Sequence, residues 1–459
     1  MLGMPASKQE ASKLRLTRRT RVVVISLIWV VVLCLGLVTA ELYARRVGGY
    51  ERWSWPLRKV PYSARDNLKV WNRRFYEQRL RSFREWPIPI ELFDADKPTP
   101  RYLFKPSLRM ALHGNKLEVA KTGERVYWSS NSWGFRGPEF PIRKRTGVLR
   151  VACLGASTTE GMQGDEETYP YFLQQELSRL FPGREIEVIN AGHHGQDIDD
   201  LLEILRQRVL PLEPDVILFY EAANNINWPE FIKGLPAPCF GDCWLRQYPD
   251  WYGSLYRRSA LFNLITESFG LNDRKPPPMP HDLDNSFLEA SAKHYREALS
   301  EIVREATDRG SVIVLSSFVT IAHEGLTVSA TDKPLLYREV YRRLYPLTPG
   351  EVARVYAIFN QQSAAVAREF NVPYADVASQ FPQDAQYFYL DYIHLSPEGN
   401  RLLAKLFANF LARAVIHTLI NGQSDNSSHP AKLRGAPNKL FNRTRLHIAL
   451  YHQRLVHAD

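Results

Sequence analysis

Cysteine is scarce in this chain, with four residues among 459, which argues against a secreted scaffold held together by disulfides. Cys34 and Cys153 lie in apolar runs, where a thiol usually behaves as a small hydrophobic group. Cys239 and Cys243 occur in the segment PAPCFGDCW and are near enough to close a small loop in an oxidising compartment. We therefore expect a disulfide between them.

Motifs for two common classes of ligand are missing. No further Cys or His at ligand spacing accompanies the paired cysteines, as a zinc site would require. No Gly-Lys-Ser or Gly-Lys-Thr follows a glycine-rich turn, which excludes a Walker loop. The sequence also shows no internal repeat.

The adjacent His193 and His194, with acidic residues at positions 197, 199 and 200, raise a metal site as an alternative. Adjacent histidines point in different directions on a loop, however, and acidic side chains fit the first turn of a helix, where its dipole favours them. We therefore expect neither a metal nor a cofactor.

Positive charge is concentrated at the two ends of the chain. Of the formal net charge of +10, residues 1–21 contribute +5 and residues 421–459 contribute +4, which leaves +1 for everything between them. A nearly neutral middle is not the electrostatic footprint of a polyanion-binding protein. The sequence therefore argues against a nucleic-acid partner.

The run VVVISLIWVVVLCLGLVTA fills residues 22–40 without a charge, and at about 1.5 Å per residue it is long enough to cross a bilayer core. It has no polar face, unlike a core helix of that length. The basic residues before it predict a cytoplasmic N-terminus, with the chain after Glu41 in the periplasm or outside the cell. A signal peptide removed after Ala40 is the alternative, because VTA resembles a cleavage site.

The segments around the main domain are assigned from composition. Residues 41–100 are rich in Trp, Tyr and Arg and predict a juxtamembrane stalk, with a helix around 64–86 and with Trp53 and Trp55 near the lipid interface. Residues 101–148 predict lead-in strands and turns, in which Arg136 either binds a substrate carboxylate or forms a structural ion pair. Residues 421–459 form a basic tail.

Apolar strands alternate with helical stretches through residues 149–420. We expect strands at 149–154, 186–190, 216–220, 312–317 and 372–377, and helices at 169–180, 199–209, 288–309, 349–370 and 397–418. Strands separated by helical crossovers predict an α/β fold, with a mostly parallel sheet covered on both faces. Two long connections, 228–284 and 320–348, are candidate walls or lids of a site.

Candidate site residues follow four of these strands, at the sheet edge where parallel sheets bind ligands. Ser157 follows the first strand, Gly192 the second and Asn224 the third, while Asp391 and His394 come after the last. A serine before a helix is often only an N-cap. A nucleophilic serine instead needs a base, a group that orients the base and donors for an oxyanion, and these turns carry them.

The four blocks resemble those of the SGNH hydrolases, the GDSL-like lipase and esterase superfamily, over residues 151–415. The resemblance implies a three-layer α/β/α fold with a five-stranded, flavodoxin-like sheet. It also implies roles for five residues: Ser157 as nucleophile, His394 as general base, Asp391 as the group that orients it, and an oxyanion hole made by the N–H groups of Ser157 and Gly192 with the amide of Asn224.

Three residues depart from the family's pattern: Ala156 replaces an Asp, Ala222 a Gly and Asn225 an Asp. None of the three is expected to act as nucleophile, base or oxyanion donor. The segment NSWGFRG, before the first block, also resembles a lead-in of bacterial membrane-anchored members.

The resemblance and the predicted location together imply a membrane-anchored esterase that cleaves a carboxylic ester through an acyl-serine intermediate. A small acyl group, such as acetyl on an envelope glycan, is the expected substrate by analogy. Two alternatives remain open. An O-acyltransferase would pass the same acyl group to a sugar hydroxyl, and a catalytically silent protein would only bind glycans.

Overall fold

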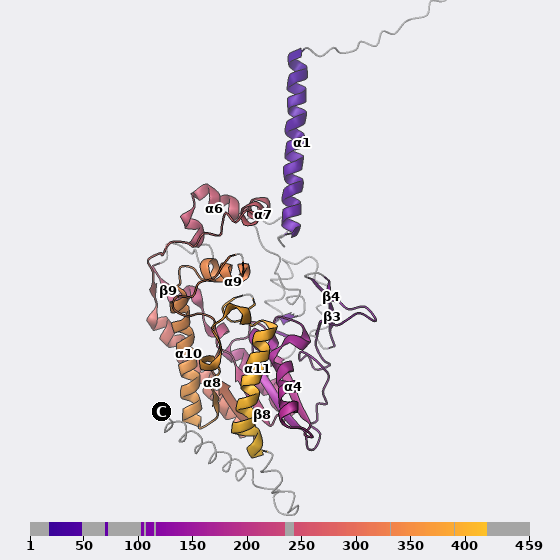
Figure 1. The fold of residues 1–459 in the computed structure, drawn as a ribbon, viewed down its shortest axis with the longest axis vertical. Coiled ribbons are helices and arrows are strands. Elements are labelled where there is room, and N and C mark those ends of the chain that lie inside the picture. The colour runs from indigo at the N-terminus through magenta and orange to yellow at the C-terminus, as the bar shows by residue number, and fades with distance from the viewer. Residues whose placement is uncertain are drawn as a thin grey trace, which may run out of the picture. The chain divides into compact units, whose positions relative to one another are not determined.

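The computed structural model describes residues 18–47, 69–71, 102–104, 107–113, 116–234, 243–330, 332–389 and 391–419. These residues belong to two compact units. One unit contains helix α1 (Arg18–Val47) and residues 248–274, and the other contains the remaining described residues. Figure 1 shows both as ribbons.

The larger unit is built on a five-stranded sheet with strand order β12-β11-β8-β6-β7, in which every neighbouring pair is parallel. All residues of β6, β8 and β11 are buried, as expected for parallel strands covered on both faces. The predicted parallel sheet is thus confirmed. The strands are β6 (Leu149–Gly155), β7 (Ile186–Gly192), β8 (Val216–Tyr220), β11 (Val312–Ser316) and β12 (Tyr374–Ala375).

Helices cover both faces of this sheet and complete three layers. Helix α4 packs against α11, whereas α8 packs against both α5 and α10. The predicted bounds of α4 and α10 are those observed, because a threonine caps each N-terminus and a proline stands in each first turn. The helices are α4 (Tyr169–Leu180), α5 (Ile198–Ile204), α8 (Asn285–Asp308), α10 (Pro349–Phe370) and α11 (Pro397–Leu411).

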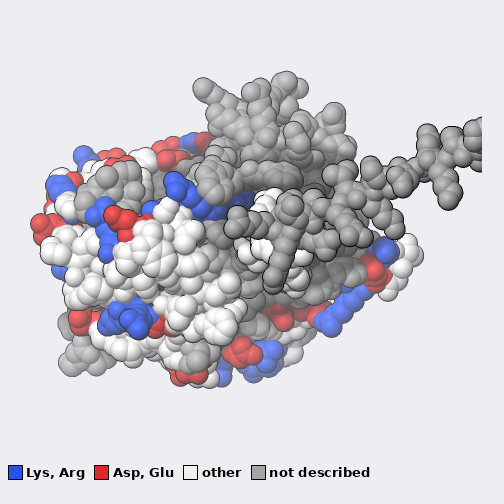
Figure 2. Space-filling model, turned by 90° about the horizontal axis from the view of Figure 1, so that it is seen from above, with Lys and Arg blue, Asp and Glu red and all other residues white. Residues whose placement is uncertain are grey.

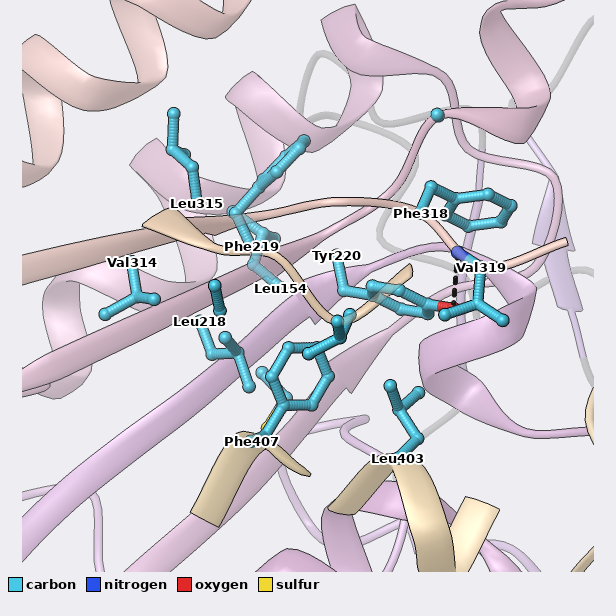
Figure 3. Close-up of a cluster of buried hydrophobic side chains, with 14 of the residues drawn as sticks. Leu154, Leu218, Phe219, Tyr220, Val314, Leu315, Phe318, Val319, Leu403 and Phe407 are labelled. Carbon is cyan, nitrogen blue, oxygen red and sulfur yellow. Dashed lines mark hydrogen bonds between the residues drawn. The ribbon is translucent and has the colours of Figure 1, made fainter. Parts of the chain in front are cut away.

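The buried core around the end of β8 combines aromatic and aliphatic side chains (Figure 3). The ring of Tyr220, at the end of β8, stacks on Phe318 at a centroid distance of 5.0 Å and meets Phe407 of α11 edge-on at 5.6 Å. Its hydroxyl accepts a hydrogen bond from the N–H of Val319 at 3.3 Å. The last residue of β8 is therefore fixed in position, which also fixes the turn after it.

The lead-in segment forms a three-stranded antiparallel sheet, β4-β3-β5, as the expected strands and turns require. Its strands are β3 (Arg109–His113), β4 (Lys116–Val119) and β5 (Trp128–Ser129). A single bridge from Arg136 to Asn190 connects the lead-in to β7.

Two expectations need correction. The strand expected at 372–377 is shorter, because β12 lies at the sheet edge and pairs only through Tyr374 and Ala375. Within the helix expected around 64–86, the three described residues form a strand instead: β1 (Lys69–Trp71) pairs antiparallel with β2 (Tyr102–Phe104). Trp53, Trp55 and the rest of 64–86 lie outside the described residues.

The first insertion is closed at its base by the short strands β9 (Ile232–Lys233) and β10 (Asp282–Leu283), which pair antiparallel. Within it, residues 248–274 belong to the unit of α1, although the sequence predicts a wall or lid of the site. They form α6 (Asp250–Tyr256) and α7 (Ala260–Ser268). Cys243 is disulfide-bonded, Cys34 and Cys153 carry free thiols, and Cys239 lies outside the described residues.

Two described helices are long and apolar enough to cross a membrane, at 22–46 and 397–419. In the second, Leu403, Phe407 and Leu411 are fully buried in the core, which identifies a core helix. The first exposes its apolar side chains throughout residues 22–38.

On the face seen in Figure 2, acidic and basic side chains are interspersed over the described surface.

Candidate active site

The turn after β6 presents Ser157 as the first residue of the short helix α3 (Ser157–Glu160). The residue that caps this helix is Ala156, with no side-chain hydrogen bond to the helix. The hydroxyl of Ser157 is therefore not a helix cap. Gly155 is required before the turn, because a Cβ atom there would lie 2.4 Å from the carbonyl oxygen of Tyr220.

Ser157, His394 and Asp391 form one continuous chain of hydrogen bonds. The Oγ atom of Ser157 lies 2.8 Å from Nε2 of His394, and Nδ1 of His394 lies 2.6 Å from Oδ2 of Asp391. Ser157 is only 6% exposed and His394 only 9%, so water competes little for these contacts. An imidazole placed in this way can take a hydroxyl proton while the carboxylate orients its ring.

The carboxylate of Asp391 is held in its charged form. Burial would raise its pKa, but the charge of His394 and hydrogen bonds from neighbouring groups lower the pKa to about 2. Its Oδ1 atom accepts the N–H groups of Ile393 at 2.9 Å and His394 at 2.8 Å. This local turn leaves Oδ2 free to accept the proton on Nδ1 of the imidazole.

The predicted oxyanion donors differ in their availability. Ser157, at the start of α3, has no helical acceptor for its N–H. The Nδ2 atom of Asn224 donates to the carbonyl oxygen of Gln196 at 2.9 Å. An amide nitrogen carries two protons, so this bond orients the side chain and a second proton remains for a ligand.

Gly192, which the sequence predicts as an oxyanion donor, has a structural role in this fold. Its N–H donates to Oδ1 of Asn190 at 3.0 Å, within the protein. A Cβ atom at Gly192 would lie 2.1 Å from the backbone nitrogen of Glu160. The glycine therefore lets β7 approach the nucleophile turn closely.

Glu221 is a buried residue of the site that the sequence reasoning missed. It follows β8, and its Oε1 accepts the N–H of Asn224 at 2.9 Å. Burial raises the pKa of Glu221 to about 7, against the lowering effect of the N–H groups of Asn224 and Ala156 and of the charge of His394. The carboxyl group thus joins the Asn224 turn to the Ser157 turn. An acidic residue at the end of the apolar run VILFY is the signal that could have identified it.

Arg136 is a structural residue, in line with the second of its two expected roles. It is 3% exposed and pairs with Asp165 at 3.0 Å. Its guanidinium also donates to the carbonyl oxygens of Glu160, the last residue of α3, and of Gly161 and Gln163, which follow it. The lead-in segment thereby holds the exit of the turn that carries Ser157.

Gln163 and Asn400 connect the segment after Ser157 to the segment after His394, a link that no sequence pattern predicted. The Nε2 atom of Gln163 donates to the carbonyl oxygen of Leu395 at 2.7 Å, next to His394. Asn400 donates to Oε1 of Gln163 at 3.3 Å and to the carbonyl oxygen of Glu167 at 2.9 Å. These contacts fix the position of His394 relative to Ser157.

The two histidines of the second turn face different neighbours. His193 is buried against Phe135, with ring centroids 6.4 Å apart, and burial lowers its pKa to about 4. His194 stacks on His394 at a centroid distance of 6.5 Å. Among the described residues, no three His, Cys, Asp or Glu side chains are placed to hold a metal ion.

The acidic residues that follow these histidines belong to a helix start, as the dipole argument predicts. Asp197 caps α5 by accepting the N–H of Asp200 at 3.1 Å, and Asp199 pairs with His294 at 2.9 Å. Asn225, one of the departures from the family's pattern, accepts the N–H of Ile198 at 2.9 Å. It therefore ties the third turn to the start of α5.

The second insertion contributes an ion pair that interacts electrostatically with Asp391. Its helix α9 (Pro334–Arg338) continues into a π-helical segment, Glu339–Arg343, in which Arg343 pairs with Glu339 at 3.0 Å. Burial raises the pKa of Glu339 to about 7, although the nearby charge of Arg343 lowers it. The charge of Asp391 raises the pKa of both Glu339 and Arg343. The Arg343 side chain is 66% exposed and accessible to a ligand.

A family model, that of the GDSL-like lipase/acylhydrolase family, matches residues 232–402, a span that includes Asp391 and His394 but not Ser157. No curated protein sequence matches this chain. Solved structures do match. A lipase/acylhydrolase from Enterococcus faecalis is 16% identical, with 57% of this chain and 95% of that chain covered and a TM-score of 0.33. The acetylxylan esterase Axe2 from Geobacillus stearothermophilus is 17% identical, with 57% and 94% covered and a TM-score of 0.34.

The matched domain and the parallel sheet agree with the order of the four blocks in the sequence, and Ser157, His394 and Asp391 meet at the edge where those blocks converge. Residues 232–402 of this chain thus form a domain that matches the GDSL-like lipase/acylhydrolase family.

Proposed function

We propose that this chain is a membrane-anchored serine esterase in which Ser157 is the nucleophile. The observation that carries the proposal is the hydrogen-bonded chain from Ser157 through His394 to Asp391. Oγ of Ser157 attacks the ester carbonyl carbon while Nε2 of His394 takes its proton, and the carbonyl electron pair moves to oxygen. The N–H of Ser157 and the amide of Asn224 stabilise that oxyanion, with Gly192 as the third predicted donor.

The second half of the reaction returns the enzyme to its starting state. The oxyanion collapses, the bond to the alcohol oxygen breaks, and His394 gives its proton to the leaving alkoxide, so that the acyl group stays on Ser157. Water then attacks the acyl-enzyme while His394 accepts its proton, and the acid leaves as Ser157 regains a proton. Asp391, charged throughout, stabilises the imidazolium in both steps.

The proposed substrate is a small acyl ester of an envelope glycan. Two features support this choice. Helix α1 fits a membrane span that keeps the enzyme beside the envelope, and Arg343 offers an exposed hydrogen-bond donor near the triad. A guanidinium suits hydroxyl-rich ligands better than an acyl chain, because all its donors need polar acceptors.

The remaining organisation is part of the proposal. Residues 1–21 form a cytoplasmic tail, 22–40 the anchor, 41–100 a stalk, 101–148 the lead-in, 149–420 the hydrolase domain and 421–459 a tail.

The disulfide of Cys243 supports an oxidising compartment for the hydrolase domain, and Cys239 is its proposed partner. Mass spectrometry of an unreduced digest would show the peptide that contains both cysteines two hydrogens lighter than its reduced form. Two free thiols would contradict the pairing.

A panel of p-nitrophenyl esters of increasing chain length tests the reaction. We expect turnover to be highest for acetate and to fall with chain length. Adding a glycan acceptor distinguishes hydrolysis from transfer: an esterase releases free acid at the same rate, whereas an acyltransferase yields an acylated sugar. No turnover of any ester, with or without an acceptor, would contradict the proposal.

A reporter that is active only outside the cytoplasm, fused after Thr418, tests the orientation separately. We expect an active reporter and a protein that stays with membranes after a high-salt wash. An active cytoplasmic reporter in the same position would overturn the proposed topology without affecting the esterase assignment.

A further inference from the structure

Helix α1 does not end where its apolar run ends, and its last turns hold helix α7 within the same unit (Figure 1). The carboxylate of Glu41 accepts hydrogen bonds from the hydroxyl of Ser259 at 2.7 Å and from the N–H groups of Ala260 and Leu261 at 2.9 Å each. Arg45 pairs with Glu41 at 2.8 Å and donates to the carbonyl oxygen of Arg258 at 3.3 Å. The start of α7 is therefore fixed to α1.

That attachment point lies directly beside the apolar run. Glu41 is the first charged residue after residues 22–40, so the start of α7 is held within about one helical turn, roughly 5 Å, of the end of that run. If α1 spans a bilayer, this level is the polar headgroup region next to the hydrocarbon core.

The burial pattern of α7 is the reverse of that of a water-exposed helix. It turns the polar Asn263 and Thr266 inward, at 4% and 1% exposure, while Ile265 is 43% exposed. The residues after it continue the apolar surface, with Phe269 at 75% and Leu271 at 52%. A helix in water normally buries its apolar stripe and exposes its polar one.

The inward polar residues are hydrogen-bonded within the unit, apart from Oδ1 of Asn263, which has no partner among the described residues. Nδ2 of Asn263 donates to the carbonyl oxygen of Tyr256 at 2.6 Å. Nδ2 of Asn272 donates to the hydroxyl of Thr266 at 2.9 Å, and Oδ1 of Asn272 accepts the hydroxyl of Tyr252. The polar network holds α6, α7 and the loop after them together, while Ile265, Phe269 and Leu271 stay exposed.

Helix α6 adds to the same kind of surface. Trp251 and Leu255 are one helical turn apart and therefore share a face, at 60% and 43% exposure. The segment 248–274 carries three arginines and three acidic residues, so its net charge is zero. Its attraction to a surface must then come from apolar side chains rather than from charge.

We propose that the apolar surface of α6 and α7, made of Trp251, Leu255, Ile265, Phe269 and Leu271, lies in the lipid interface of the membrane that α1 spans. The proposal rests on the proposed anchoring role of α1. Continuity with α1 identifies lipid as the occupant, because Glu41 and Arg45 keep α7 next to the anchor. Tryptophan and phenylalanine are the side chains that interfacial helices use at this depth.

The test uses the full chain in phosphatidylcholine nanodiscs, with an environment-sensitive fluorophore on one cysteine and a doxyl quencher near the headgroup end of the lipid chains. Phe269→Cys in a Cys34→Ser background carries the probe, since the other free thiol, on Cys153, is buried. Lys293→Cys on α8, at 77% exposure, is the matched control. The native Cys34, exposed on α1, reports whether the anchor is in the bilayer.

We expect the probe at 269 to emit at shorter wavelength than the probe at 293 and to lose intensity to the quencher, with little change in high salt. If the probe at Cys34 is quenched but the probe at 269 matches the one at 293, the interfacial surface is refuted and the anchor stands. A probe at 269 that is blue-shifted but unquenched would mean that protein covers the surface, which also overturns the proposal. Absence of quenching at Cys34 would overturn the anchor as well.

Discussion

The Nε2 atom of His394 lies 2.8 Å from the Oγ atom of Ser157, although 237 residues separate the two in the chain. The sheet explains how they meet, because the turn after β6 and the loop before α11 both lie at the carboxyl edge of parallel strands. Gln163 and Asn400 then fix the two loops to each other.

Replacing Asp391 with asparagine should lower kcat on the order of 10³–10⁴-fold, because the wrong imidazole tautomer would face Ser157. The substitution should also change acid stability. The pKa of Asp391 is lowered to about 2, so its contribution, about 2 kcal/mol, is present above its ordinary pKa and is lost as the pH falls through 2. Denaturant unfolding should show a lower free energy of unfolding for the variant than for the wild type at pH 6. This difference should shrink toward pH 3. A deficit that does not change with pH would contradict this assignment.

Glu221 should impose the opposite pH dependence. Because burial raises its pKa to about 7, its contribution to stability is complete below the ordinary glutamate pKa and is lost as the pH rises through 7. The Glu221→Gln variant should therefore gain about 2 kcal/mol relative to the wild type between pH 5 and pH 8. Chemical denaturation at both pH values measures the difference. Glu166→Gln, at a side chain 70% exposed, supplies the baseline, and an unchanged difference would refute the role.

Arg343→Gln should raise KM for an acetylated glycan roughly three- to tenfold, which corresponds to one lost hydrogen bond of ordinary strength. It should leave turnover of p-nitrophenyl acetate nearly unchanged, because that substrate has no sugar for the guanidinium to bind. Arg354→Gln is the matched control, since Arg354 is similarly exposed at 70% and lies on α10. Equal effects of Arg343→Gln on both substrates would remove the argument for a glycan.

The sequence predicts the parts of the fold that local chemistry determines. The bounds of α4 and α10 follow from Thr168 and Thr348 as caps with a proline in each first turn. The buried strands follow from apolar runs between helices. The strand β12 shrinks because its length depends on a single neighbour, which no periodicity reveals. The π-helical segment 205–209, which continues α5, is likewise invisible to a search for helical periodicity.

The sequence predicts those site residues whose side-chain type itself defines their proposed role. Ser157, Asp391 and His394 come together as the sequence predicts. The supporting residues were not predictable in the same way. Gln163 and Asn400 bond across long sequence separations, and the N–H of Gly192 is used by Asn190. Such contacts depend on how turns approach in space, which a single sequence does not encode as a motif.

The central claim, that Ser157 is an activated nucleophile, is tested most directly by measuring esterase rate, fluorophosphonate labelling and melting temperature on one Ser157→Ala sample. Labelling requires a hydroxyl whose proton a base can take. Thr348→Ala is the control, since it removes a true N-cap and should cost about 1 kcal/mol of stability while leaving activity intact. We predict that Ser157→Ala abolishes rate and labelling with an unchanged melting temperature, because this hydroxyl caps no helix. Full activity with a lowered melting temperature would contradict the account.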